Sequence, residues 1–314
     1  MSDKGLSGTK KTFKLNRYYP YIFVAPFFLA FLCFGFLPML FSLFISLTKW
    51  SGYGEIKFVG LSNYVSLLQN ELLYKSILNT LLIISVTIPL SILIALVISY
   101  IINNVLKRGR TFYSTLYFLP YVITPVAIGI IFRMLFDRQN GFFNMLMMNL
   151  GLINEPVFWF GNPGTSRFVV IAMIVWKNMG YFIVLICAGL QTISPEYYES
   201  ATIDGAGMAR IFTRITVPLL KPTLVFCMIT STISGLQLFA EPLYLFSVSD
   251  MTRSLGGPGK CVYTIVTYMY ESAFINGKWG DGSAIAYILF LLISVLTLSL
   301  MKIINKGGIL GEKS

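Results

Sequence analysis

The chain has 314 residues, of which 56% are hydrophobic and 12% are charged. Soluble globular domains carry about 25% charged residues, so this composition excludes an ordinary water-soluble fold and indicates a lipid environment. The net charge of +11 would suit a nucleic-acid-binding protein, but here the basic residues lie between long apolar runs that no such fold requires.

Six apolar segments follow one another along the chain, and each is long enough to cross a bilayer as a helix of about 20 residues. The first segment is too long for a signal peptide and lacks a clean cleavage site, so we expect it to be retained. The sequence therefore predicts an all-α polytopic membrane protein with six transmembrane helices. The segments are Tyr21–Leu47, Ile77–Ile102, Thr115–Phe136, Phe168–Leu190, Thr223–Phe246 and Ala284–Ile304.

The positive-inside rule orients these segments, because the loops on one side hold most of the 24 Lys and Arg residues and a minority of the 13 Asp and Glu residues. Both termini are then cytoplasmic. We expect a basic cytoplasmic tail at 1–19, a first transmembrane helix at 20–50, a transmembrane domain at 72–304 and a cytoplasmic tail at 305–314. The localisation is the cell membrane of a prokaryote, with multiple passes.

Two long loops, 137–167 and 247–283, lie on the other side and are rich in Gly and Pro. The first is typical of irregular structure or short interfacial helices, and the second contains a clear turn signal at Gly256–Gly259. Prolines also interrupt or flank the apolar segments, for example Pro125 and Pro242. They indicate kinked, packed helices, a bundle that lines a watery path, or both.

The loop 191–222 is the longest on the cytoplasmic side, and its pattern is helical. Ser194 suits the N-cap and Pro195 the first position of a helix, which Gly205 can end or bend. A second, amphipathic helix follows from about Met208. Pattern alone leaves two interpretations: a surface that docks a partner, or an amphipathic helix that lies on the lipid.

A resemblance to a known family favours docking. The loop resembles the EAA motif of importer permeases, which runs Glu-Ala-Ala, three residues, Gly, about nine residues, then Ile-x-Leu-Pro. It departs at Ser200 and at Val217, and both changes are mild. The residues that carry the resemblance are Glu199, Ala201, Asp204, Gly205, Ala206, Phe212, Ile215, Pro218 and Pro222.

Other stretches resemble the carbohydrate-uptake branch, of maltose and multiple-sugar type, within the binding-protein-dependent transport permeases of ABC importers. They are Phe58–Tyr64, which reads FVGLSNY, together with Asn79-Thr80, Phe118–Pro120, Ile174–Asn178 and Gly256–Pro258. The resemblance implies the type I importer permease fold, in which the loop 191–222 forms a coupling helix that docks on an ATPase. Its coupling residues would be Glu199, Ala201, Asp204, Gly205 and Ala206.

The same resemblance implies the partners. They are a second homologous permease, two ATP-binding subunits, an extracytoplasmic solute-binding protein and membrane lipid, with no nucleic acid. We expect no cofactor on this chain, because it has no GxxxxGK[ST] phosphate loop, and ATP-Mg on the partner ATPase. We expect no metal and no enzyme activity, since histidine is absent and no paired carboxylates meet within a segment.

Polar residues within apolar segments mark a candidate substrate path at Asn178, Gln237, Glu241 and Tyr244. Together with aromatic neighbours they offer the hydrogen bonds and ring faces that a sugar needs. Helix packing is the alternative, and for Lys177 and Glu241 we expect charges that reach outward to the interface. A permease for glycerol-phosphate or an amino acid, or an ion-driven transporter, remain alternative functions.

Overall fold

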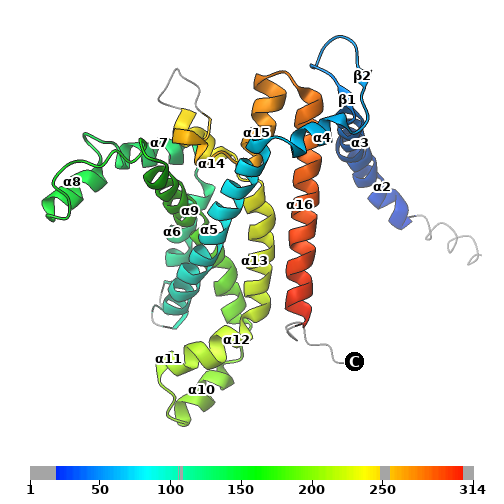
Figure 1. Cartoon of the computed structure of the whole chain (residues 1–314). Helices are drawn as coiled ribbons and strands as arrows, with labels where there is room; N and C mark the ends of the chain where they lie inside the picture. The colour runs from blue at the N-terminus through cyan, green and yellow to red at the C-terminus, as the bar shows by residue number, and fades with distance from the viewer. Residues whose placement is uncertain (1–18, 105, 107–108, 248–254, 307–314) are drawn as a thin grey trace, which may run out of the picture.

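The computed structural model describes residues 19–104, 106, 109–247 and 255–306, which form a bundle of helices (Figure 1). Four helices are long and apolar enough to cross a membrane, or up to six if each of two bent pairs is one span. One end of the bundle carries α10 (Pro195–Ile203), and the opposite end carries α15 (Ile265–Tyr270). We call these the α10 end and the α15 end.

The long helices coincide with the first, second, fourth and sixth apolar segments predicted from the sequence. The first is continuous from Tyr19 to Ser46, with a π-helical turn at Leu32–Phe36 between α2 (Tyr19–Phe31) and α3 (Leu37–Ser46). The other three extend beyond the predicted bounds, because polar residues continue each helix outside its apolar stretch. They are α5 (Glu71–Asn104), α9 (Pro163–Gln191) and α16 (Trp279–Lys306).

The third predicted segment is not one straight helix, which corrects the sequence-based expectation. It divides into α6 (Arg110–Val122) and α7 (Pro125–Leu135), with an angle of 94° between them. The residue before a proline avoids the helical region, and Thr124 is extended with ψ of 143°. Pro125 therefore ends α6 and begins a new helix.

The fifth predicted segment is also broken, a second correction. α13 (Lys221–Leu236) ends at the fourteenth residue of the predicted span, and α14 (Ala240–Ser247) follows after a short break. Pro242 has no N–H to donate to the carbonyl of Leu238. That carbonyl instead accepts a hydrogen bond from Thr264 Oγ1 at 2.7 Å, so the break is satisfied by a distant segment.

The segment 137–167 contains one short helix, α8 (Phe142–Asn149), which agrees with one of the two predicted alternatives. The fully buried Asn144 fixes this segment. Its Nδ2 donates to the carbonyl of Val157 at 3.0 Å, and its Oδ1 accepts from Trp159 Nε1 at 2.9 Å. Phe136 packs on the same indole, so the segment is anchored to α7.

Further short elements at the α15 end were not expected from the sequence. Strands β1 (Thr48–Lys49) and β2 (Lys57–Phe58) pair antiparallel, and α4 (Ser62–Leu68) follows them. The predicted loop 247–283 contains α15 and a π-helical turn at Glu271–Ile275, while its predicted turn forms a 3-10 turn at Pro258–Lys260. Most of the predicted tails, 1–18 and 307–314, lies outside the described residues.

Gly180 lets α6 and α9 pack closely, because a Cβ at this position would lie 2.0 Å from the carbonyl oxygen of Tyr117. We predict that Gly180→Ala destabilises the purified chain by about 1–3 kcal/mol, as overpacking does. The measurement is thermal unfolding in detergent. Gly164→Ala, in the same helix, is the control, since its Cβ would meet only Asn162 Oδ1 at 3.4 Å. Equal melting temperatures would contradict the close approach.

Candidate functional site

A polar cavity of about 570 Å³ lies where α5, α6, α9 and α13 meet the break before α14. Of the predicted path residues, Asn178, Gln237 and Glu241 line it, although they are separated by up to 63 positions in the chain. Hydroxyl groups of α13 add to the lining at Thr230, Ser231 and Ser234. The volume is within the range of roughly 300–1,000 Å³ that small-molecule sites occupy.

The two charged residues of the lining form an ion pair. Lys177 Nζ lies 2.5 Å from Glu241 Oε1, and each side chain is only 14% exposed. These charges therefore do not reach outward to the interface, as expected from the sequence, but pair with each other between α9 and α14, which is compatible with a role in helix packing. Glu241 also sits in the first turn of α14, where the helix dipole favours a negative charge.

The break between α13 and α14 presents Gln237 to the cavity. Gln237 is exposed, whereas Leu236 before it is fully buried, so the chain turns its polar side chain into the open space. Phe239, also in the break, lines the cavity and contacts the ring of Tyr270 at 5.1 Å. A straight helix through this segment would not present these side chains together.

Tyr244, the fourth predicted path residue, is not among the described residues that line the cavity. Its backbone packs on α7 instead, where a Cβ on Gly129 would lie 3.1 Å from the Tyr244 carbonyl carbon. A role for Tyr244 in the path stays a prediction without support from this geometry. The expectation was based on the three-residue spacing between Glu241 and Tyr244 in one helix. That spacing does not tell which neighbouring helix each residue contacts.

Two tyrosines in the lining were missed by the sequence analysis. The rings of Tyr121 and Tyr181 stack with their centroids 5.0 Å apart, and both face the cavity. Tyr181 follows Lys177 by one helical turn, so helical spacing could have found it. Tyr121 comes from α6, and its place beside α9 could not be read from spacing.

The loop 191–222 forms two helices around a bend, as predicted. Ser194 Oγ accepts a hydrogen bond from the N–H of Glu196 at 3.4 Å at the start of α10. At its end, the N–H of Ala206 donates to the carbonyl of Ala201 and that of Gly205 to Thr202, which is a Schellman motif. Gly205 has φ of +75°, a conformation that glycine adopts without strain.

Of the predicted coupling residues, Glu199 and Ala201 lie in α10, which is at the end of the bundle opposite α15 (Figure 1), and Asp204, Gly205 and Ala206 follow this helix directly. Glu199, Asp204 and Gly205 are exposed and Ala206 is half-buried, whereas Ala201 is buried. The neighbouring Ile203 is 86% exposed, and the acidic side chains of Glu199 and Asp204 are exposed on the same segment.

A second helical stretch connects this loop to the bundle. It consists of α11 (Met208–Ile211), a π-helical turn (Phe212–Thr216) and α12 (Val217–Leu219), and it meets α13 at an angle of 64°. The ring of Phe212 contacts Tyr100 of α5 at 4.8 Å between centroids. The loop is thus attached to α9 and α13 by the backbone and to α5 by the contact of Phe212 with Tyr100.

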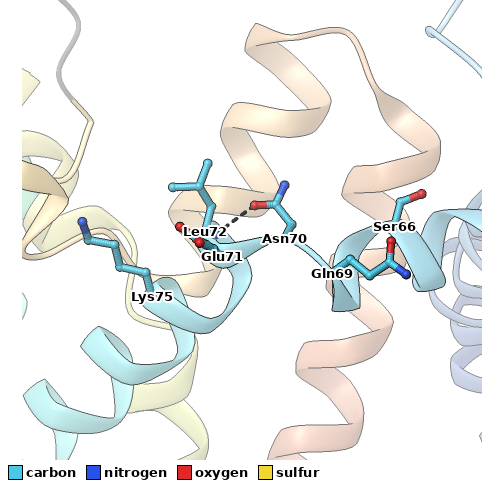
Figure 2. Close-up of a pocket in the computed structure, with 6 residues that line it drawn as sticks. All are labelled: Ser66, Gln69, Asn70, Glu71, Leu72 and Lys75. Atoms are coloured by element: carbon cyan, nitrogen blue, oxygen red, sulfur yellow. Dashed lines mark hydrogen bonds between the residues drawn. The ribbon is translucent and has the colours of Figure 1, made fainter.

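A hollow of about 530 Å³ lies at the α15 end, between α4 and the start of α5 (Figure 2). Asn70 Oδ1 accepts the N–H of Leu72 at 2.9 Å, as Figure 2 shows, so this polar group caps α5. The hollow is separate from the cavity and shares none of its lining. Its residues are Ser66, Gln69, Asn70, Glu71, Leu72 and Lys75.

Comparison with known proteins identifies relatives along nearly the whole chain. Residues 75–307 match the family described as binding-protein-dependent transport system inner membrane component. The chain is 34% identical over 307 residues to the arabinooligosaccharides transport system permease protein AraP of Bacillus subtilis (strain 168), covering 98% of this chain and 94% of that protein. It is 33% identical over 288 residues to the lactose transport system permease protein LacF of Rhizobium radiobacter, covering 90% and 94%.

A solved structure shares the fold. It is the crystal structure of a bacterial ABC transporter involved in the import of the acidic polysaccharide alginate. The TM-score is 0.77 at 24% identity, and the match covers 93% of this chain and 97% of that chain. A second solved structure, of a bacterial alginate ABC transporter in complex with an alginate pentasaccharide-bound periplasmic protein, is similar with the same TM-score of 0.77 at 24% identity, and covers 93% of this chain and 96% of that chain.

The cavity geometry makes a prediction about access to water. In a Cys33→Ser background, which removes the exposed cysteine, Gln237→Cys should react with a membrane-impermeant maleimide, because position 237 is open to the cavity. Leu236→Cys is the matched control and should stay unlabelled, since Leu236 is fully buried. Labelling is measured by gel shift in membranes. Equal labelling of the two positions would contradict a water-filled cavity at the break.

Proposed function

We propose that this chain, which belongs to the family of binding-protein-dependent transport system inner membrane components, is the membrane-spanning permease subunit of an ATP-driven sugar importer. The observation that carries the proposal is 34% identity over almost the entire length to a permease of an oligosaccharide transport system. A permease for lactose and one for trehalose and maltose, from Thermococcus litoralis, are also similar, at 33% and 31% identity. The polar cavity with its tyrosine rings supports a sugar as the cargo.

The α10 end is the cytoplasmic end in this proposal, so both termini are cytoplasmic. The count over the whole sequence supports this orientation, because the segments on this side hold most of the 24 Lys and Arg residues and cytoplasmic loops are enriched in them. With six passes, the two bent helix pairs would each count as one span.

The loop 191–222 is the coupling helix. Its exposed tip, with Glu199, Asp204 and Gly205, inserts into a groove of a separate ATPase subunit that binds ATP-Mg. When two such ATPases close, α10 moves with them. The contact of Phe212 with Tyr100 passes this motion to α5, and α12 passes it to α13.

The cavity is part of the translocation path, and a second homologous permease completes it. The first helix, Tyr19–Ser46, is almost entirely exposed in this chain: only 6% of its apolar 18-residue stretch is buried. Its surface is therefore available to contact lipid and the second permease. An extracytoplasmic binding protein delivers the sugar at the α15 end. The solved transporter with its periplasmic protein supports such a partner. Asn178 and Gln237 then hydrogen-bond the sugar as it passes.

Reconstitution tests the function directly. Proteoliposomes that contain this chain, its second permease, two ATPase subunits and the binding protein should import a radiolabelled oligosaccharide from a panel of lactose, maltose, trehalose and arabinotriose. Import should require ATP and every subunit, because this chain couples to hydrolysis in a partner. Import by this chain alone, without ATP, would overturn the proposal in favour of an ion-driven transporter.

The coupling loop makes a specific prediction in the same assay. Gly205→Val should lower uptake about tenfold or more, since a β-branched residue at φ of +75° costs roughly 1–3 kcal/mol and distorts the bend. Gly207→Val is the control, because Gly207 has φ of −70° and open space around its Cα. Complex assembly is checked by size-exclusion chromatography. Normal uptake by Gly205→Val would show that the bend is not needed for coupling.

The attachment of the loop to α5 makes a second prediction. Phe212→Ala removes the ring contact with Tyr100, so sugar imported per ATP hydrolysed should fall several-fold while the complex still assembles. Phe226→Ala, at a position that is 52% exposed on α13, is the matched control. Uptake and phosphate release are measured together. If the two variants behave alike, Phe212 does not transmit the motion.

A further inference from the structure

The cavity has an unusual charge balance for a site within apolar helices. Among the described residues that line it, Lys177 and Glu241 are the charged ones, and all other polar lining groups are hydroxyls, phenols or amides. The two charges lie 2.5 Å apart, so they neutralise one another within the lining. The cavity offers many hydrogen-bonding groups and no net charge.

The pair is held where it forms. Each side chain is 14% exposed, and Glu241 is fixed in the first turn of α14 while Lys177 comes from the middle of α9. Removing either partner would leave a charge in a largely desolvated place, which is unfavourable. Neither charge is therefore free to serve as the sole counter-charge of a bound ligand.

This balance discriminates between neutral and anionic sugars. A carboxylate, sulfonate or phosphate that enters the cavity loses water and needs a positive partner there. Beside the pair it meets Glu241 as well as Lys177, so attraction and repulsion largely cancel. A neutral saccharide loses nothing from this cancellation, because Asn178 and Gln237 can bond its hydroxyls and the Tyr121–Tyr181 stack can cover its ring faces.

We propose that the Lys177–Glu241 pair makes this path selective for neutral saccharides and against sugars that carry an acidic group. The proposal rests on the sugar-import function given above and adds the charge class of the cargo. The fold itself does not set this property, because the solved transporter of the same fold imports an acidic polysaccharide. Side chains in the cavity must therefore decide it.

The test uses the complete reconstituted importer and two matched probes. One is the neutral oligosaccharide that the importer takes up, and the other is the same molecule oxidised to a uronate at one primary alcohol. The affinity of the binding protein for each probe is measured by calorimetry, and uptake is compared with the binding protein saturated. The binding protein is identical in every arm, so a change in the uronate-to-neutral uptake ratio belongs to the permease.

The native chain should prefer the neutral probe. Glu241→Gln, which frees the positive charge of Lys177, should raise the uronate-to-neutral ratio about tenfold, the effect of one charge-assisted hydrogen bond. Lys177→Gln should lower that ratio below the native value. The exchanged pair Lys177→Glu with Glu241→Lys restores neutrality, so its ratio should return toward the native one even if its total uptake is reduced.

Controls separate the possible outcomes. Lys302→Gln, at an exposed position of α16 outside the cavity lining and outside the loop 191–222, should leave both uptake rates unchanged. If the pair is only a structural clamp, the single variants lose uptake of both probes equally and the ratio stays constant, which would overturn the proposal. Equal native uptake of both probes would also overturn it while leaving sugar import intact. Absence of import of every saccharide would instead contradict the proposed function.

Discussion

The structure depends on one constraint of the lipid environment: a backbone N–H or C=O group that is not paired within its helix must find another partner inside the protein. The break after α13 satisfies this constraint through Thr264, whose hydroxyl donates to the carbonyl of Leu238. Thr264 is itself fully buried just before α15, and Asn79 of α5 donates to the neighbouring carbonyl of Tyr263. The segment around α15 therefore makes the interruption of α13 possible, and the interruption in turn opens the polar cavity.

α13 connects the two candidate sites of the molecule. At one end it continues from the exposed loop through a bend of 64°, and at the other end it stops at Gln237 in the cavity lining. If a partner protein moved the loop at one end of a rigid helix, the residues at the other end would move as well. One helix can therefore couple a docking surface to a cavity. The small and hydroxylated residues of α13 suit this position, because they allow α5 to pack close by: a Cβ on Gly235 would lie 2.9 Å from Ile84.

Proteins of this family can share a fold and still carry different solutes, because the packing of the helices and the chemistry of the cavity lining depend on different residues. Apolar packing between α5 and α9 needs volume and shape, which many sequences provide at 24% identity. The lining needs particular groups at particular points, such as an amide at Gln237 or a charge pair across α9 and α14. A few substitutions there would change the chemical groups that the cavity presents while the bundle remains the same.

The sequence by itself determined what local chemistry controls: the apolar segments, the cap at Ser194, the bend at Gly205 and the helix that follows from Met208. It also singled out Asn178, Gln237, Glu241 and Tyr244 as a candidate path, since polar residues in apolar segments are rare, and the first three of these line one cavity. Only the tertiary structure decided that the third and fifth segments are broken, that Tyr121 stacks on Tyr181, and that Lys177 pairs with Glu241 across 64 positions. The reason is physical: a helical pattern reports a residue's own turn and face, whereas the partner of a buried charge or of a freed carbonyl comes from whichever distant segment the bundle brings beside it.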